Sequence, residues 1–282
     1  MSIKKMQGLY GLKWNPFVQD IPSEAVVRTP KFDQFCYRVE TLTLEGGFAL
    51  ITGDSGLGKS VSLRALSDHL SKMPDITVGE ISRPQSGLAD FYREMGSVFG
   101  IELRASNRWG GYKSLREKWK HHIDSTLLRP VLLIDEAQEM QACVLSELRL
   151  LSMEKFDSSS LLSIVLCGDS RLTNAFKEIS LIPIGTRIRT RLLMEAWSKP
   201  QLMELLAESV KRAGNAELIT KELIETLAEH SIGNPRVMMN LAAECLSAGM
   251  RKESVRLNDS LFFELFPAPS SPNANRKKSS AR

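Results

Sequence analysis

Long apolar runs and paired cysteines are missing from this chain of 282 residues. Its four cysteines, Cys36, Cys143, Cys167 and Cys245, lie far apart and form no Cys-x-x-Cys pair. This spacing argues against a structural zinc site and against a disulfide scaffold. No window approaches the roughly 18–20 consecutive apolar residues that span a bilayer. The N-terminus has no apolar segment typical of a secretory signal, so we expect a cytoplasmic protein without a membrane partner.

An overall basic surface is also missing. The formal charge of +4 comes from 37 basic and 33 acidic residues. Residues 267–282 contain four basic residues and no acidic one, so the rest of the chain balances to zero. We expect these residues to form a disordered basic tail. Any nucleic-acid surface on the folded part must therefore be local.

Apolar segments alternate with amphipathic ones over the first two thirds of the chain. Hydrophobic residues make up 43% of the sequence, enough for a sizeable core. We expect strands at residues 47–52, 76–81, 131–134 and 161–166 and a weaker one at 192–194, with helices between them. This alternation predicts an α/β fold whose parallel sheet carries helices on both faces. Beyond residue 198 only helical patterns remain, which predicts a small all-helical domain.

A glycine-rich segment joins the first expected strand to the helix that follows it. Its sequence is Gly53-Asp54-Ser55-Gly56-Leu57-Gly58-Lys59-Ser60, which fits G-x-x-x-x-G-K-[ST] between a strand and a helix, as that motif requires. We expect these residues and the following Val61 to bind the nucleotide. Glycines let backbone N–H groups approach phosphate oxygens, and the helix N-terminus adds positive potential. We expect Lys59 to bridge the β- and γ-phosphates and the Ser60 hydroxyl to bind Mg²⁺.

Two acids end the strand at residues 131–134. Asp135 is expected to hold Mg²⁺ through water, and Glu136 to polarise the attacking water as general base. Such a pair favours ATP hydrolysis over transfer to a small acceptor. The next expected strand ends at Gly168-Asp169-Ser170, where Asp169 or Ser170 could lie beside the γ-phosphate or simply lead into a turn.

Arginines mark two further places. Arg187, Arg189 and Arg191 alternate just before the last expected strand, where they would share one face. They form either a solvated edge or a group donated to a neighbouring subunit's γ-phosphate. Arg236 falls in the first turn of a helix, where the macrodipole disfavours a cation, which suggests that it serves a ligand.

One basic segment with interleaved aromatics runs from Arg104 to Lys120, with a local charge of +5. Such a segment suits contact with a phosphate backbone, but it is equally typical of a solvated helix face anchored by Trp119. The candidate DNA contacts are Lys113, Arg116, Lys118 and Lys120.

Taken together, these motifs resemble those of AAA+ ATPases, in the order of that family. The resemblance implies that Arg236 is the sensor 2 arginine and that Arg187 or Arg191 is an arginine finger. The chain is most similar to the ExeA/GspA-like group. Three segments carry that similarity: Tyr10-Gly11-Leu12-Lys13-Trp14-Asn15-Pro16-Phe17, Leu133-Ile134-Asp135-Glu136-Ala137-Gln138, and Val165-Leu166-Cys167-Gly168-Asp169-Ser170-Arg171-Leu172. In the last segment Asp169 replaces the group's glutamine, which leaves the sensor 1 assignment open.

Stand-alone ATPases of this kind resemble the helper proteins of bacterial transposons (TnsC/TniB, IstB and MuB). The resemblance implies a slow, regulated ATPase that uses ATP and Mg²⁺. It would form a ring or filament on duplex DNA and serve a transposase or integrase in target selection. The alternatives are a cytoplasmic ATPase of a secretion or assembly system with a protein partner, and a signalling ATPase. We expect an N-terminal segment flanking the nucleotide site (1–46), an ATPase domain (47–198), a helical lid (199–266) and the tail (267–282).

Overall fold

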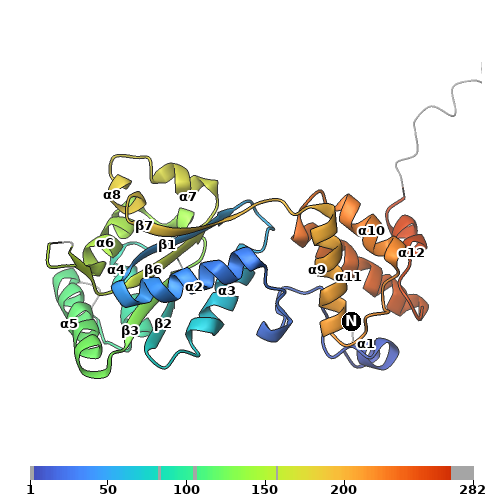
Figure 1. Ribbon diagram of the computed structural model, residues 1–282, viewed down its shortest axis with the longest axis horizontal. Helices are drawn as coiled ribbons and strands as arrows, with labels where there is room; N and C mark the ends of the chain where they lie inside the picture. Colours follow the sequence, from blue (N-terminus) through green and yellow to red (C-terminus); the bar gives the residue numbers. More distant parts are fainter. Residues whose placement is uncertain (1–2, 82–83, 104–106, 157, 268–282) are drawn as a thin grey trace, which may run out of the picture. The chain divides into compact units, whose positions relative to one another are not determined.

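The computed structural model describes residues 3–81, 84–103, 107–156 and 158–267, without the side chain of residue 3 (Figure 1). The chain divides into two compact units. The α/β unit is Pro22–Ala196, and the helical unit combines Met1–Ile21 with the part that starts at Trp197. The expected tail (267–282), apart from its first residue, and Arg104 lie outside the described residues.

A five-stranded parallel sheet forms the centre of the α/β unit. Its strands are β1 (Gly47–Gly53), β2 (Ile76–Ile81), β3 (Arg129–Ile134), β6 (Ser163–Gly168) and β7 (Ile188–Met194), in the order β2-β3-β6-β1-β7. The predicted fold class is therefore confirmed. Strand β7 begins earlier than residue 192, because an edge strand with one buried side alternates apolar and polar residues instead of forming an apolar run.

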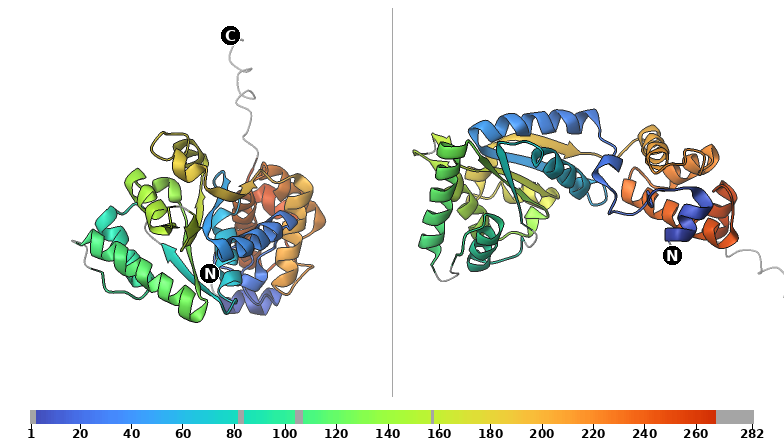
Figure 2. Two further views of the ribbon diagram at one scale, coloured as in Figure 1. Left: turned by 60° about the vertical axis from the view of Figure 1, so that its left-hand side comes forward. Right: turned by 90° about the horizontal axis from the view of Figure 1, so that it is seen from below.

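Helices cover both faces of this sheet (Figure 2). On one face lie α2 (Pro30–Glu45) and α3 (Lys59–Leu70), and on the other lie α4 (Leu88–Val98), α5 (Arg108–Thr126) and α6 (Ala142–Ser152). Successive strand residues point to opposite faces, so Phe48 and Leu50 of β1 join the core beneath α4–α6, whereas Ala49 and Ile51 are buried on the opposite face.

Helix α2 was not among the helices expected from the sequence, which assigned residues 1–46 to one N-terminal segment flanking the nucleotide site. The Thr29 hydroxyl caps α2 by accepting from the Phe32 N–H at 3.2 Å, and Pro30 occupies the first turn. The segment is also divided between the two units, because residues 22–46 pack in the α/β unit and residues 1–21 in the helical unit.

The helical unit contains the expected helices beyond residue 198. These are α9 (Lys199–Arg212), α10 (Lys221–His230), α11 (Pro235–Lys252) and α12 (Asp259–Leu265). Helix α1 (Ile3–Tyr10) and the segment after it complete the unit's core with Met6, Tyr10, Leu12 and Phe17. The N-terminal residues are therefore an integral part of this unit.

Shorter elements connect the main ones. They are the 3₁₀ turns η1 (Ser23–Ala25) and η2 (Ala137–Glu139), the helices α7 (Ser170–Ala175) and α8 (Ile182–Gly185), and an unexpected hairpin of β4 (Met153–Glu154) and β5 (Ser159–Ser160). Within the described ranges, no helix has both the length and the apolar character needed to cross a bilayer.

A buried carboxylate joins three helices of the α/β unit. Glu147 of α6 is 3% exposed and accepts a hydrogen bond from the Tyr92 hydroxyl of α4 at 2.5 Å. The Arg108 guanidinium of α5 donates to both carboxylate oxygens, with a distance of 3.1 Å from Nε to Oε1. Burial, followed by the hydrogen bond to Glu147, raises the pKa of Tyr92 far above its usual value. The carboxylate is thus fully partnered in a place where an unpaired charge would be costly.

We predict that Glu147→Ala lowers the free energy of unfolding by about 2–3 kcal/mol. This is less than for a fully buried pair, because the Arg108 side chain is 57% exposed. Urea unfolding followed by tryptophan fluorescence measures the loss. The exposed Glu117→Ala on α5 is the control and should change stability by less than about 0.5 kcal/mol. Equal losses in the two variants would contradict the role given to Glu147.

Candidate nucleotide site

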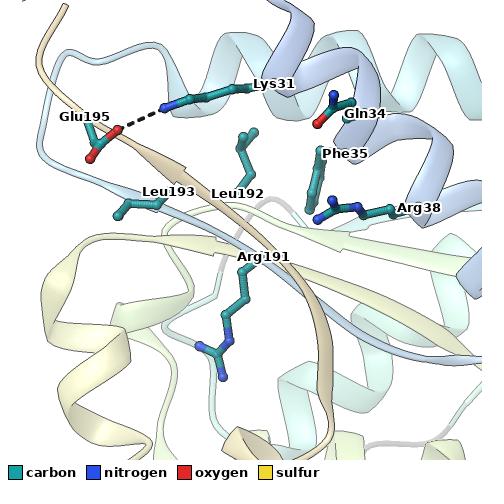
Figure 3. A pocket seen from close by; sticks show the side chains of 8 residues that line it. All are labelled: Lys31, Gln34, Phe35, Arg38, Arg191, Leu192, Leu193 and Glu195. Atoms are coloured by element: carbon teal, nitrogen blue, oxygen red, sulfur yellow. Dashed lines mark hydrogen bonds and ion pairs between the residues drawn. The ribbon is translucent and has the colours of Figure 1, made fainter.

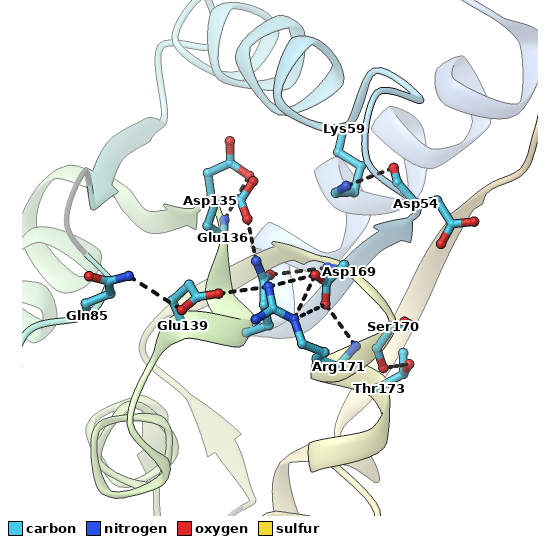
Figure 4. Close-up of polar contacts among 11 residues, drawn as sticks. Asp54, Lys59, Gln85, Asp135, Glu136, Glu139, Asp169, Ser170, Arg171 and Thr173 are labelled. Atoms are coloured by element: carbon cyan, nitrogen blue, oxygen red, sulfur yellow. Dashed lines mark hydrogen bonds and ion pairs between the residues drawn. The ribbon is translucent and has the colours of Figure 1, made fainter. Parts of the chain in front are cut away.

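The glycine-rich loop connects β1 to α3 as the motif predicts. Gly58 takes up φ 98° immediately before α3, a left-handed conformation that favours glycine. Lys59 opens the helix and is only 7% exposed, and its Nζ donates to the Asp54 carbonyl at 3.0 Å (Figure 4). A buried ammonium group needs an anion or several acceptors. The loop thus presents a nearly buried cation at the N-terminus of a helix, which suits a phosphate.

Asp135 and Glu136 lie at the same edge of the sheet as this loop, because the carboxyl ends of parallel strands meet there (Figure 4). Only β6 separates β3 from β1. The Asp135 Oδ1 accepts from the Glu136 N–H at 2.9 Å, and Glu136 has φ 50°. Burial, followed by the charge of nearby Asp135, raises the pKa of the Cys167 thiol on β6 far above its usual value. A carboxylate and the Ser60 hydroxyl are the hard oxygen donors that Mg²⁺ prefers, so these residues fit the ion.

Asp169 follows β6 at this edge, but its carboxylate is already partnered. It caps α7 by accepting from the Arg171 N–H at 2.9 Å and pairs with the Arg171 guanidinium, with 2.9 Å from Nε to Oδ2. Arg171 also pairs with Glu139 at 2.8 Å. The hydrogen bond from Arg171 is the main cause that lowers the pKa of Asp169. Asp169 therefore stays ionised and turned toward Arg171, which disfavours the sensor role considered from sequence; the Ser170 side chain is exposed.

Gln138 is a residue of this site that the motif-based reasoning overlooked. Its Nε2 donates to Glu136 Oε2, and its Oε1 accepts from the Asp169 N–H at 3.2 Å. One side chain therefore connects the acid after β3 to the end of β6. Its signal in the sequence was its place at the end of the segment 133–138 that carries the resemblance, which fixes no contact by itself.

The three alternating arginines were expected just before the last strand, but two of them lie within the edge strand β7, because that strand begins at Ile188. Arg189 and Arg191 point to solvent from β7, and Arg187 precedes the strand. The Arg191 Nη2 donates to the Gly185 carbonyl at 3.1 Å, and Arg187 donates to the Pro183 carbonyl. Gly53 pairs with Met194 at the far end of β7. At about 3.3 Å per residue, roughly 20 Å of strand separates Arg187 from the chain's own phosphate loop.

Arg236 lies in the first turn of α11 in the helical unit, as predicted. Asn234 caps the helix by accepting from the Arg236 N–H at 3.0 Å and the Val237 N–H at 3.3 Å. The Arg236 side chain is exposed.

Most of the basic residues of α5 that the sequence left open as DNA contacts or a solvated helix face have partners within the α/β unit. The Arg116 guanidinium donates to the Leu151 carbonyl at 2.8 Å, Lys118 donates to the Gly100 carbonyl at 3.2 Å, and Lys120 pairs with Glu154. These three contacts tie α5 to its neighbours and favour the structural interpretation of the segment. Lys113 stays exposed, 6.0 Å from the centre of the Trp109 ring.

A separate hollow of about 310 Å³ opens between α2 and β7 (Figure 3). Phe35, Leu192 and the ion pair of Lys31 with Glu195 (3.0 Å) line it, and the Arg191 guanidinium turns away from α2.

Residues 43–176 match the family described as AAA domain. This part of the chain, slightly less than half of it, is similar to AAA domains of P-loop ATPases, and ATP with Mg²⁺ is the ligand that its loop and acids fit.

Among particular proteins, the chain is 28% identical over 216 residues to general secretion pathway protein A of Aeromonas hydrophila, covering 75% of this chain and 39% of that protein. The chain thus spans about two fifths of that relative's length. Similar solved structures are the Aeropyrum pernix ORC2 protein in ADPNP–ADP complexes (TM-score 0.70, 14% identity, 91% of this chain and 71% of that chain) and the Aeropyrum pernix ORC1 protein in complex with DNA (TM-score 0.66, 16% identity, 88% and 67%). These two show the likeness in fold.

We predict that Lys59→Ala weakens ATP binding about 30- to 1000-fold, because a nearly buried cation loses its place against the phosphates. Glu136→Gln should bind ATP like the parent but hydrolyse it at least about 100-fold more slowly. Titration with a fluorescent ATP analogue and a phosphate-release assay measure the two effects. Unchanged affinity in the first variant, or unchanged turnover in the second, would contradict the assignment.

A second prediction concerns the thiols, since the thiolate is the reactive form. Burial raises the pKa of Cys36 to about 11 and that of Cys245 to about 11, and raises that of Cys167 even more. At pH 8 we expect one fast thiol, the exposed Cys143, and three that react only after unfolding in guanidinium. Iodoacetamide labelling with mass spectrometry tests this, and Cys143→Ser should remove the fast phase. Equal labelling of Cys167 and Cys143 in the native chain would contradict it.

Proposed function

We propose that this protein is an ATP-dependent DNA-binding ATPase that assembles on duplex DNA and acts as a transposase accessory in target selection. The observation that carries the proposal is the position of Arg187 and Arg191. Arg187 is about 20 Å along β7 from the chain's own phosphate loop, and Arg191 points to solvent from the edge strand. At that distance Arg187 can complete a nucleotide site only on another copy, and the outward direction of Arg191 also suits a neighbouring copy.

In the proposed reaction, Lys59 and the N–H groups of residues 53–61 hold the ATP phosphates. Ser60 and Asp135 would hold Mg²⁺, which neutralises charge on the phosphate oxygens. The Glu136 carboxylate orients the attacking water and takes its proton. Arg187 or Arg191 of a neighbouring copy would stabilise the charge that develops on the transferred phosphoryl group.

Arg236 is proposed to report the γ-phosphate from the helical unit. The chain passes between the two units twice, at residues 21/22 and 196/197. Met194 lies two residues before the second passage and contacts the phosphate loop, since a Cβ on Gly53 would lie 2.5 Å from the Met194 carbonyl oxygen. A nucleotide that moves this loop would therefore act directly on the segment leading to the helical unit.

The proposed DNA surface is smaller than the α5 segment and includes the hairpin. Trp109 is 67% exposed, its ring stacks on Tyr112 with centroids 5.5 Å apart, and Lys113 lies beside it. Phe156 at the hairpin tip is fully exposed, next to the exposed Lys155. The hairpin adjoins α5 through Lys120–Glu154. Exposed aromatics beside cations suit nucleic acid.

A secretion or assembly ATPase with a protein partner is the second candidate. It is favoured by the similarity to general secretion pathway protein A over 75% of this chain. The same exposed aromatics would then contact protein, and DNA would have no effect on assembly.

The deciding experiment is electron microscopy of the protein with duplex DNA and a non-hydrolysable ATP analogue, compared with ADP and with no nucleotide. We predict rings or filaments only with the analogue and DNA, and their loss in Arg187→Ala or Arg191→Ala.

The double variant Lys113→Ala/Phe156→Ser should weaken DNA binding about tenfold or more and reduce the slope of log K against log salt by about 1. Lys221→Ala, an exposed lysine of α10, is the matched control. Particles that ignore DNA would favour the second candidate.

A further inference from the structure

The Glu136 side chain is exposed and needs an anchor to act as a base. Among the described residues, Gln138 supplies the only hydrogen bond to its carboxylate. The backbone around Glu136 is fixed, because its N–H donates to Asp135 Oδ1 at 2.9 Å and its carbonyl accepts from the Glu139 N–H at 2.9 Å. The remaining freedom of Glu136 is therefore in its side chain, which is where Gln138 acts.

Gln138 is itself held by the end of β6. Its Oε1 accepts from the Asp169 N–H at 3.2 Å, and Gly168 leaves the space that the amide occupies. A Cβ on Gly168 would lie 2.5 Å from Gln138 Oε1, much closer than any real contact. Since that oxygen faces a donor, the Nε2 end is fixed toward Glu136.

The Asp169 N–H is in turn held in place by an ion-pair cluster. Arg171 joins Asp169 and Glu139 with distances of 2.8 Å, and Asp169 caps α7. Glu139 closes the 3₁₀ turn that carries Gln138. The Arg171 guanidinium thus binds both Asp169, whose N–H donates to Gln138, and Glu139 of the turn that carries Gln138. This fixes the distance between the N–H and the turn.

We propose that Gln138 is a positioning residue that directs the Glu136 carboxylate toward the attacking water, an inference that rests on the hydrolysis proposed for this site. The orientation of Gln138 is in turn fixed by its hydrogen bond to the end of β6. In this role it acts only through Glu136, to which it donates its hydrogen bond. Misplacement of a catalytic group by about 1 Å costs on the order of 100-fold in rate. The residue therefore contributes to turnover and leaves nucleotide binding unchanged.

Single-turnover ATP hydrolysis and ATP affinity are measured for Gln138→Met, which keeps the length of the side chain but cannot form either hydrogen bond. We expect a fall in the rate of about 10- to 100-fold with affinity within about twofold. In a Glu136→Gln background the same substitution should change the residual rate less than about twofold, because the carboxylate that Gln138 positions is no longer there. Gln141→Met, an exposed glutamine three residues along, is the matched control and should have no effect.

Two further variants separate positioning from a merely structural role. Gln138→Glu keeps the acceptor for the Asp169 N–H but places a like charge against Glu136, so it should be at least as slow as Gln138→Met. Gly168→Ala displaces the amide without touching Glu136 or the nucleotide loop and should also slow the rate. A normal rate in Gln138→Glu overturns the proposal.

The remaining outcomes are also decisive. An equal fall in both backgrounds, a faster rate in Gln138→Met, or a matching loss of ATP affinity each overturns the positioning role. If Glu136→Gln hydrolyses ATP normally, the proposed base fails and the inference with it. If Glu136→Gln is slow and Gln138→Met is normal, only the inference fails.

Discussion

The near-burial of one ammonium group is the constraint on which the rest of this structure depends. Lys59 is 7% exposed, and among the described residues its ammonium group donates a single hydrogen bond, to the Asp54 carbonyl. That arrangement requires a rigid setting, which the apolar strand β1 and the buried face of α3 provide. It also requires an anion, which the left-handed glycine before the helix allows to approach the backbone closely. The carboxylates after β3 lie at the same edge of the parallel sheet as this cation, so that one cation, one helix end and two acids define the site together.

Much of this arrangement was predictable from the sequence. The parallel sheet, the phosphate loop and the acids after β3 followed from local patterns, because a strand, a turn and a helix start are each encoded within a few residues. The segment with Thr29 and Pro30 also contained a helix start, yet the prolines around it concealed α2. Gln138 could not be predicted, since its role depends on the Asp169 N–H, which is 31 residues away and reaches it only through the pairing of β3 with β6. The ion pair of Asp169 with Arg171 could not be predicted for a different reason. The two residues are only two positions apart in the sequence, but the start of α7 sets the direction of their side chains.

The basic helix α5 shows why charge counted along a sequence overstates a binding surface. Arg116 and Lys118 donate to backbone carbonyls at the end of α6 and at Gly100, and Lys120 pairs with Glu154. Helix ends leave carbonyl groups without partners, and a cation from a neighbouring helix satisfies them. What remains for a partner is a smaller group of exposed aromatics with Lys113 and Lys155. The proposed interface with nucleic acid thus rests on stacking more than on net charge.

The non-contiguous make-up of the helical unit has a consequence for synthesis on the ribosome. Its core needs Met6, Tyr10, Leu12 and Phe17 together with Leu257 and Phe262, which are translated almost the whole chain apart. The α/β unit, by contrast, is continuous from Pro22 to Ala196. Domains generally fold as units during translation. The sheet therefore closes first, while an apolar N-terminal segment waits for its partners, and this interval is when the nascent chain most needs a chaperone.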